Sequence, residues 1–486
     1  MNILDKYRVG VQHTVGVKPM TIRGPMYVLR STLFLLGALL VAMPAVAQEQ
    51  EGVVLPQTAG AAGAPAPENT NEAAGEESPE GAEEVEQQPD VAELQRQLDT
   101  LAEEVERLRA GDVAEPVDVD RARALGLAPS AAATYGVERG VSIAGYGELL
   151  IENFADTNQG GAPTNAYTKS DFLRAILYTG YRFNDKFLFN SEIEVEHAKE
   201  IYVEFAYIDY QATENFGLRG GMLLAPMGLV NEYHEPNVFI GAERPVTENR
   251  IIPSTWRENG GGIYGAFSNV AFRAYVMNGF NGSKFSSKGV RGGRQKGAKA
   301  KSTSLGFTGR VDVTPTPGVF FGASIYSGDS GQGEIDVDGI EYGIKTTIWD
   351  LHGQAQVRGV DIRALFARAN LSDAAKLNEA LGLSGSKGVA EQMQGSYISF
   401  GYDVLSQVTG NAGVALTPYI RYEVVDTQAV MPVGFTRSLS TDIRFITAGI
   451  ELKPIPNIVL KLDHAWASND ANDAVNQFNI NLGYAF

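Results

Sequence analysis

Residues 476–486, NQFNINLGYAF, alternate between two kinds of side chain. Side chains of a strand point alternately to its two faces, so one face here carries only apolar or aromatic residues: Phe478, Ile480, Leu482, Tyr484 and Phe486. A strand of a soluble sandwich can show this pattern. The length, however, suits a tilted strand that crosses a bilayer, with aromatic residues at the level of the interface. We therefore interpret the stretch as the closing strand of a transmembrane β-barrel.

The composition agrees with this interpretation. The chain of 486 residues contains 54 glycines, 20 tyrosines and 22 phenylalanines, as barrels with aromatic belts require. Beyond the amino terminus there is no apolar run of about 18 residues, so we expect no helical membrane span. The absence of cysteine excludes disulfides and thiolate metal sites. We expect neither a cofactor nor a bound metal.

The net charge of −18 is distributed unevenly. Residues 48–120 contain 20 acidic and 3 basic side chains, a balance of −17, whereas residues 141–486 contain 36 acidic and 29 basic ones, a balance of −7. The acidity therefore belongs mainly to a leader segment, and the main domain is close to balanced. This distribution does not suggest a nucleic-acid partner.

The amino terminus has the features of a secretory signal. Arg30 precedes the apolar run 33–43, which is followed by an Ala-x-Ala cleavage site at residues 45–47. We predict a signal peptide over 1–47, with Met20 or Met26 as alternative true starts. A short membrane anchor is the alternative, but the run is too short to span a bilayer.

Three further segments precede the barrel. Residues 48–89 are rich in Ala, Gly, Pro and Glu, a composition that predicts a disordered acidic linker. Residues 90–111 carry an apolar seam with spacings of 3 and 4, formed by Val91, Leu94, Leu98, Leu101, Val105 and Leu108. This seam predicts a short coiled coil and hence an oligomer; an amphipathic helix on the barrel is the alternative. Residues 112–140 are interpreted as a second linker.

Sixteen strand candidates follow, which predicts an all-β fold with a sixteen-stranded antiparallel transmembrane barrel over 141–486. They lie near 141–154, 170–183, 187–198, 201–212, 216–225, 260–267, 270–279, 303–314, 318–328, 344–357, 360–370, 393–405, 413–425, 442–453, 457–467 and 475–486.

The lengths of the connections depend on their position. Connections after even-numbered strands are short turns rich in Asn, Asp, Pro or Gly, with one longer exception near 406–412. Connections after odd-numbered strands are mostly long, although the one near 199–200 is hardly a loop. A soluble β protein has no reason to separate its loops in this way. An outer-membrane barrel has short periplasmic turns and long external loops.

Four stretches resemble the phosphate-selective porin family: GYGE at 145–148, GYRFNDKF at 180–187, LAPMG at 224–228 and IPSTWRENG at 252–260. The resemblance covers residues 140–486, and some relatives also have a leading coiled coil. It implies a sixteen-stranded, trimeric channel for anions such as phosphate in the outer membrane of a Gram-negative bacterium. It also implies that the third external loop, 226–259, folds into the pore.

Pore selectivity depends on charge at a constriction. Loop 226–259 contains Arg244, Arg250 and Arg257 next to several glutamates, which predicts a transverse field across an eyelet. A packed loop whose charges neutralise each other is the alternative. Two strands before this loop also carry charge on the lumen wall: Arg174 and Arg182 of strand 170–183 are expected to face the carboxylates Glu192, Glu194 and Glu196 of strand 187–198.

The fourth external loop is strongly basic, with no acidic residue between 278 and 311. Its cations are Lys284, Lys288, Arg291, Arg294, Lys296, Lys299, Lys301 and Arg310. Such a run raises the local anion concentration over a range of about 8–10 Å at physiological salt. Binding to lipopolysaccharide phosphates, or a merely solvated flap, is the alternative.

We expect a passive channel for small hydrophilic solutes, with anions favoured. A cation-preferring or sugar-accepting pore stays open because of the lumen carboxylates, and a structural envelope tether stays open because of the predicted coiled coil. An enzyme is disfavoured, since the histidines of the mature chain, His197, His234, His352 and His464, stand in no catalytic or metal-binding motif.

Overall fold

The computed structural model describes residues 96, 99, 122–123, 125–137, 139–408 and 413–486. The predicted signal peptide, acidic linker and coiled coil lie outside these residues, apart from Arg96 and Asp99, and stay predictions. In the described part of the chain, no helix is long and apolar enough to cross a membrane.

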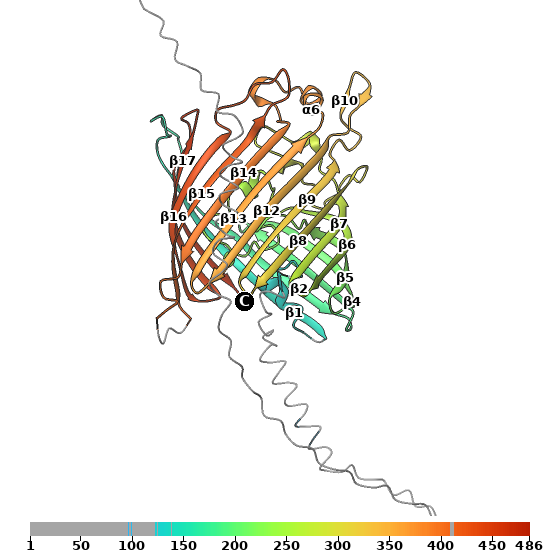
Figure 1. Ribbon diagram of the computed structural model, residues 1–486, viewed down its shortest axis with the longest axis vertical. Coiled ribbons are helices and arrows are strands. Elements are labelled where there is room, and N and C mark those ends of the chain that lie inside the picture. Colours follow the sequence, from blue (N-terminus) through green and yellow to red (C-terminus); the bar gives the residue numbers. More distant parts are fainter. Residues whose placement is uncertain (1–95, 97–98, 100–121, 124, 138, 409–412) are drawn as a thin grey trace, which may run out of the picture. The chain divides into compact units, whose positions relative to one another are not determined.

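The main architecture is a closed antiparallel barrel of sixteen strands, in which each strand pairs with its sequence neighbours and the last pairs with the first (Figure 1). The barrel strands are β1 (Gly140–Phe154), β2 (Lys169–Arg182), β3 (Phe187–Glu196), β4 (Glu200–Thr213), β5 (Phe216–Leu224), β6 (Arg257–Phe267), β7 (Val270–Asn278), β8 (Leu305–Thr316), β9 (Val319–Asp329), β12 (Lys345–Val357), β13 (Val360–Leu371), β14 (Gln392–Tyr402), β15 (Ala415–Val430), β16 (Asp442–Ile455), β17 (Ile458–Asn469) and β18 (Gln477–Ala485).

The remaining elements lie outside the barrel sheet. The strands β10 (Asp336–Val337) and β11 (Ile340–Glu341) form a separate two-stranded sheet between β9 and β12. The helices are α4 (Pro129–Ala133), α5 (Thr247–Arg250) and α6 (Ala374–Ala380), with short 3-10 turns η1 (Gly282–Lys284), η2 (Arg291–Gly293) and η3 (Gly385–Lys387).

Each of the sixteen predicted strands overlaps one barrel strand, so the predicted fold class of the barrel is confirmed. The division between short and long connections is also confirmed, including the predicted exceptions at 197–199 and 403–414. The connection 470–476, before the last strand, is a third intermediate case.

The closing strand β18 follows its alternating pattern. Phe478 and Leu482 are exposed on the outer face, whereas Asn479 and Asn481 are buried on the inner face. Leu149 of β1 pairs with Leu482, and the backbone groups of Gly145 and Phe486 exchange two hydrogen bonds of 2.8 Å. The same division holds around the ring, where exposed large apolar residues alternate with buried polar ones. An apolar exterior and a polar interior are what a barrel in lipid requires.

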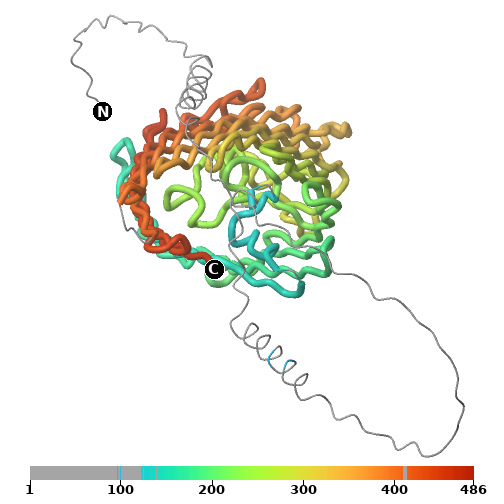
Figure 2. The backbone as a smooth tube through the Cα atoms, turned by 60° about the horizontal axis from the view of Figure 1, so that its bottom comes forward, coloured from blue at the N-terminus to red at the C-terminus, as the bar shows by residue number. Residues whose placement is uncertain are grey.

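Two segments occupy the barrel interior, and both are visible inside the ring in Figure 2. We call residues 225–256, between β5 and β6, the inner loop, and residues 122–137, before β1, the rim segment. Leu127, Ala131 and Ala132 of the rim segment are buried in one apolar cluster with Met227 and Trp256. The sequence predicts only a linker at 112–140. In the described part of this stretch, small apolar residues pack against the inner wall.

Candidate functional site in the barrel lumen

The inner loop turns into the barrel at Gly228, which has a positive φ of +67°. A Cβ atom at this position would lie 2.4 Å from Oε2 of Glu248, so only glycine fits. The Glu248 carboxylate accepts hydrogen bonds from the backbone N–H groups of Leu229 and Val230, each at 2.7 Å. Glu248 also accepts a hydrogen bond of 2.5 Å from the Tyr397 hydroxyl. The start of the loop is thus tied to its own end and to β14.

The middle of the inner loop is held by cations of the opposite wall. Arg363 of β13 donates to the carbonyl of Val238 at 2.7 Å, and Lys461 of β17 donates to the carbonyls of Phe239 and Gly241 at 2.8 and 2.9 Å. Wall carboxylates accept from the loop backbone in return: Asp463 accepts from the N–H of Ala242 at 2.7 Å. Charged hydrogen bonds of this kind are stronger than neutral ones, so they fix the loop inside the lumen.

The lumen facing β7, β8 and β12 is filled by buried ion pairs. Asp312 accepts hydrogen bonds from Arg273 at 2.9 Å and Arg310 at 2.7 Å, and lies 2.8 Å from His352. Glu232 of the inner loop adds a contact of 3.0 Å to Arg273. All of these side chains are almost completely buried. This side of the lumen is therefore closed by the network that anchors the inner loop.

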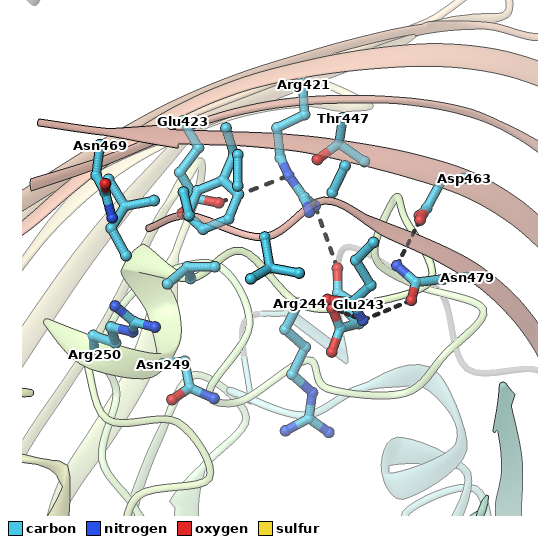
Figure 3. Close-up of a pocket in the computed structure, with 18 of the residues that line it drawn as sticks. Glu243, Arg244, Asn249, Arg250, Arg421, Glu423, Thr447, Asp463, Asn469 and Asn479 are labelled. Carbon is cyan, nitrogen blue, oxygen red and sulfur yellow. Dashed lines mark hydrogen bonds and ion pairs between the residues drawn. The ribbon is translucent and has the colours of Figure 1, made fainter. Parts of the chain in front are cut away.

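The opposite side is open. A cavity of about 450 Å³ lies between residues 243–250 of the inner loop and the inner face of β15–β18. Figure 3 shows its loop residues facing its wall residues. Its charged lining consists of Arg244, Arg250 and Arg421 together with Glu243, Glu423, Asp463 and Asp473.

The charges of the cavity differ in how they are paired. The Arg421 guanidinium donates to the carbonyls of Ile240 and Glu243, each at 3.3 Å, and Glu423 accepts from the N–H of Thr247 at 2.5 Å. Among the described residues, neither Arg244 nor Arg250 has a carboxylate within 4.0 Å. Arg244 donates instead to the carbonyl of His234 at 3.2 Å. Both guanidinium groups therefore line the cavity without a carboxylate partner in the described residues.

Burial changes the charge of one carboxyl group on the inner loop. Glu243 accepts a hydrogen bond of 3.1 Å from Gln477. Burial, with smaller contributions from Glu152 and Asp463, raises the pKa of Glu243 to about 7. Near neutral pH this side chain therefore carries only part of a negative charge, which weakens its opposition to anions.

The predicted arginines of the inner loop and its end separate into two groups. Arg244 and Arg250 line the cavity, whereas Arg257 lies on β6 and pairs with Glu204 at 2.5 Å. Most glutamates of this stretch are buried and hydrogen-bonded rather than facing the cavity; Glu258, for example, accepts from the N–H of Gln295 at 2.6 Å. Packed acids thus hold the loop, and Arg244 and Arg250 line the cavity. The transverse field across an eyelet stays a prediction.

The predicted charges of the early strands lie in the lumen, away from the cavity. Arg174 contacts Glu148 at 3.1 Å and Glu194 at 3.5 Å, and Glu192 lies 3.1 Å from His234. Glu196 is half-buried at the end of β3, and Arg182 donates to the carbonyls of Tyr135 and Val137. Arg174, Glu148 and Glu194 thus form a paired wall, as charges on adjacent strands commonly do. Arg182 lies at the other end of β2, opposite Leu188, and does not face the predicted carboxylates.

The basic external loop 279–304 is more ordered than a solvated flap. Lys284, Lys288 and Lys296 are exposed, but the Arg294 guanidinium donates to the carbonyls of residues 253–255 at 2.8–3.2 Å. Ser287 accepts a hydrogen bond of 2.7 Å from Thr427 of β15, so the loop crosses the barrel mouth. Arg291 is half-buried.

Arg310, grouped with this loop from the sequence, instead lies on β8 and pairs with Asp312. The sequence prediction that Arg310 belongs to the external basic loop is therefore wrong. Arg310 lies within β8, whose polar side faces the lumen.

Sequence reasoning did not single out the wall of the cavity. Arg421 and Glu423 lie on β15 and Asp463 lies on β17, each as an ordinary inward-facing residue of an alternating pattern, and Asp473 lies in the connection between β17 and β18. The spacing of two between Arg421 and Glu423 was the available signal. The meeting of β15–β18 with the inner loop, which creates the site, is not visible in any one stretch. In the described part of the chain, no cluster of three or more His, Asp and Glu side chains is arranged to hold a metal.

The fold and the cavity together define a closed sixteen-stranded barrel with a charged, partly filled lumen. No family model matches the chain. An uncharacterized protein of Aquifex aeolicus (strain VF5) is 39% identical to it over 355 residues, which cover 70% of this chain and 78% of that protein. The chain belongs to the family of this Aquifex protein.

Solved porin structures are more distant. The OmpF complex of Salmonella typhi with daunomycin matches with a TM-score of 0.48 and 14% identity, over 72% of this chain and 98% of that one. An anion-selective porin from Comamonas acidovorans matches with a TM-score of 0.44 and 11% identity, over 72% of this chain and 100% of that one. At these TM-scores, the similarity says nothing further about this chain.

Proposed function

We propose that this protein is an outer-membrane channel for the passive diffusion of small hydrophilic solutes, that it prefers anions, and that phosphate is the first solute to test. The observation that carries the proposal is the cavity between the inner loop and β15–β18, lined by charged side chains inside a barrel with an apolar exterior. A water-filled lumen narrowed by a charged loop is how a passive pore selects solutes.

The anion preference rests on the state of the cavity charges. Arg244 and Arg250 have no carboxylate partner within 4.0 Å in the described residues. Asp463, in contrast, accepts hydrogen bonds from Ala242 and Tyr419, and Asp473 accepts from Ser440 and Asn469. The exposed lysines of loop 279–304 add positive potential at the mouth.

A general, sugar-accepting or cation-preferring pore is the second candidate, because four carboxyl groups share the lining with three arginines. We also propose a homotrimer in the outer membrane of a Gram-negative bacterium, with the predicted coiled coil at 90–111 in the periplasm and lipopolysaccharide around the external loops. A structural tether built on that coiled coil is a third candidate.

The sign of the selectivity is tested by reversal potentials in planar bilayers under a salt gradient. We expect anion preference in the wild type and a loss of it in Arg244→Gln and Arg250→Gln. Arg444→Gln is the matched control, since Arg444 lies on β16 between the cavity residues Ile443 and Phe445 and points to the other face. A cation-side potential in the wild type overturns the anion preference, and the absence of any conductance overturns the channel itself.

A further inference from the structure

The rim segment follows the inner wall at one end of the barrel. Its carbonyl groups accept hydrogen bonds from Arg273 (to Arg123, 3.2 Å), Arg219 (to Leu125, 3.1 Å), Asn190 (to Ala131, 3.3 Å), Ser142 (to Thr134, 3.1 Å) and Arg182 (to Val137, 2.7 Å). These wall residues come from β7, β5, β3, β1 and β2, and each lies near the end of its strand that leads to a short connection or to the amino-terminal side.

The rim segment fits its groove closely. Gly126 has a φ of +70°, and a Cβ atom there would lie 2.5 Å from Oε1 of Glu232 and 2.7 Å from Cδ of Arg273. From the other side, a Cβ atom on Gly180 of β2 would lie 2.8 Å from Cβ of Thr134. Because the contact leaves no room for a Cβ atom at Gly126 of the segment or at Gly180 of the wall, the segment fits the wall in a single position.

The rim segment also holds the inner loop. Glu235 of the loop accepts hydrogen bonds from the backbone N–H and the hydroxyl of Ser130, both at 3.0 Å, and from the N–H of Ala131 at 3.2 Å. The next loop residues, 237–241, are bonded to β13, β16 and β17 near the same end of the barrel. The rim segment and the inner loop thus meet at Glu235 and together line the short-turn end of the lumen.

We propose that the rim segment is a displaceable plug that sets the width of the passage. Its seat is made by wall side chains bonding backbone carbonyls. It anchors the inner loop through Glu235 and through Tyr233, whose hydroxyl donates to the carbonyl of Arg123 at 2.9 Å. When the rim segment leaves its seat, the lumen beside β1–β7 is no longer filled at the short-turn end. The inner loop then also loses its contacts with the rim segment. Because the segment is continuous with the chain before Ala122, a pull on that chain acts directly on the contacts of Arg123. This inference rests on the proposed channel function.

The test uses the full-length protein in planar bilayers. Glu235→Ala removes one anchor of the inner loop, and Gly180→Leu pushes the segment off the wall. We expect both variants to show single-channel steps about twofold larger than those of the wild type, since the lumen of a sixteen-stranded barrel is wide when unfilled. Gly220→Ala is the control, because a Cβ atom there meets nothing within 4 Å; it should show wild-type steps.

A reversible cross-link separates displacement of the plug from misfolding. The chain has no cysteine, so Ala131→Cys and Asn190→Cys can be joined by a short, reducible thiol cross-linker in the Glu235→Ala background. We expect wild-type steps with the cross-link intact and large steps after reduction of the same channel. If the conductance steps of the cross-linked variant stay the same after reduction, the rim segment is not a displaceable plug, whether or not the wild type conducts. A wild type without any steps defeats the proposed channel instead.

Discussion

The lumen facing β7, β8 and β12 and the lumen facing β15–β18 are both lined by arginine and carboxylate side chains, but the cavity of about 450 Å³ lies on the second side. In the first, Arg273, Arg310 and Asp312 bond one another and the inner loop. In the second, the wall charges bond the loop mainly through its backbone, and Arg244 and Arg250 stay unpaired with carboxylates in the described residues. The difference teaches that pairing, and not composition alone, decides which side of a charged lumen is filled and which side keeps an open cavity.

The largest effect is expected from breaking the packed side. Arg310→Ala would leave Asp312 and Glu232 buried with one partner fewer, and loss of one partner from a buried ion pair costs about 3–5 kcal/mol. Arg444→Ala, at a half-exposed pair with Asp442 and Asp470, should cost less than about 1 kcal/mol. Urea unfolding in detergent measures both. Equal losses would show that the buried network contributes no more to stability than an exposed ion pair.

The open side should respond in conductance rather than in stability. Ala465 of β17 lines the cavity, so Ala465→Trp should reduce the single-channel conductance by roughly half by filling that space. Ala448 of β16, which pairs with His464 of β17, lies on the other face on the same side as exposed Ile446. Ala448→Trp should therefore leave the conductance unchanged. If the conductance of Ala465→Trp is unchanged, solutes pass through another part of the lumen.

A smaller effect is expected from pH. The pKa of Glu243 is raised to about 7 by burial, so the carboxyl group is mainly neutral below pH 7 and mainly charged above it. Anion preference should accordingly rise as the pH falls from 8 to 6. Reversal potentials measured at pH 6, 7 and 8 test this. In Glu243→Gln the same pH range should give a flat profile. A wild-type preference that falls on acidification would show that another group controls the field.

The smallest effect is expected from the external lysines. Lys284 and Lys288 are exposed on the loop that crosses the mouth, and their field is screened over about 8–10 Å at physiological salt. Replacing both by Gln should lower the anion conductance slightly at low salt and not at about 1 M salt. A loss that persists at high salt would mean that these lysines contact the solute directly.

The barrel was predictable because its rule is local. Phe478 and Asn479 show the alternation within two residues, and each turn carries its own Asn, Gly or Pro signal. The lumen was predictable only in part. Arg244 and Arg250 were found because they lie on one long loop, but Arg421 and Asp463 reach the cavity from strands far away in the sequence.

The rim segment was missed for a different reason. Its run of Ala, Ser, Pro and Gly from Leu127 to Gly136 has the composition of a linker, because composition reports how little apolar surface a segment can bury by itself. It does not report a groove provided by other strands. The contacts of Gly126 and Ser130 with the wall and the inner loop depend on residues about 100 or more positions away and appear only once the barrel has closed.

The wall side chains bind the inner loop largely through the backbone carbonyl and N–H groups of the loop. Arg363, Lys461 and Asp463 do so at residues 238–242. Every amino acid offers the same carbonyl, so these bonds are made by the backbone and not by the loop side chains. Phe239, Ile240 and Ala242 are themselves buried, whereas the loop residues that line the cavity begin at Glu243. A substitution at a lining position such as Arg244 therefore leaves these backbone bonds in place. Under the proposed channel function, selectivity can thus change in evolution while the scaffold is kept.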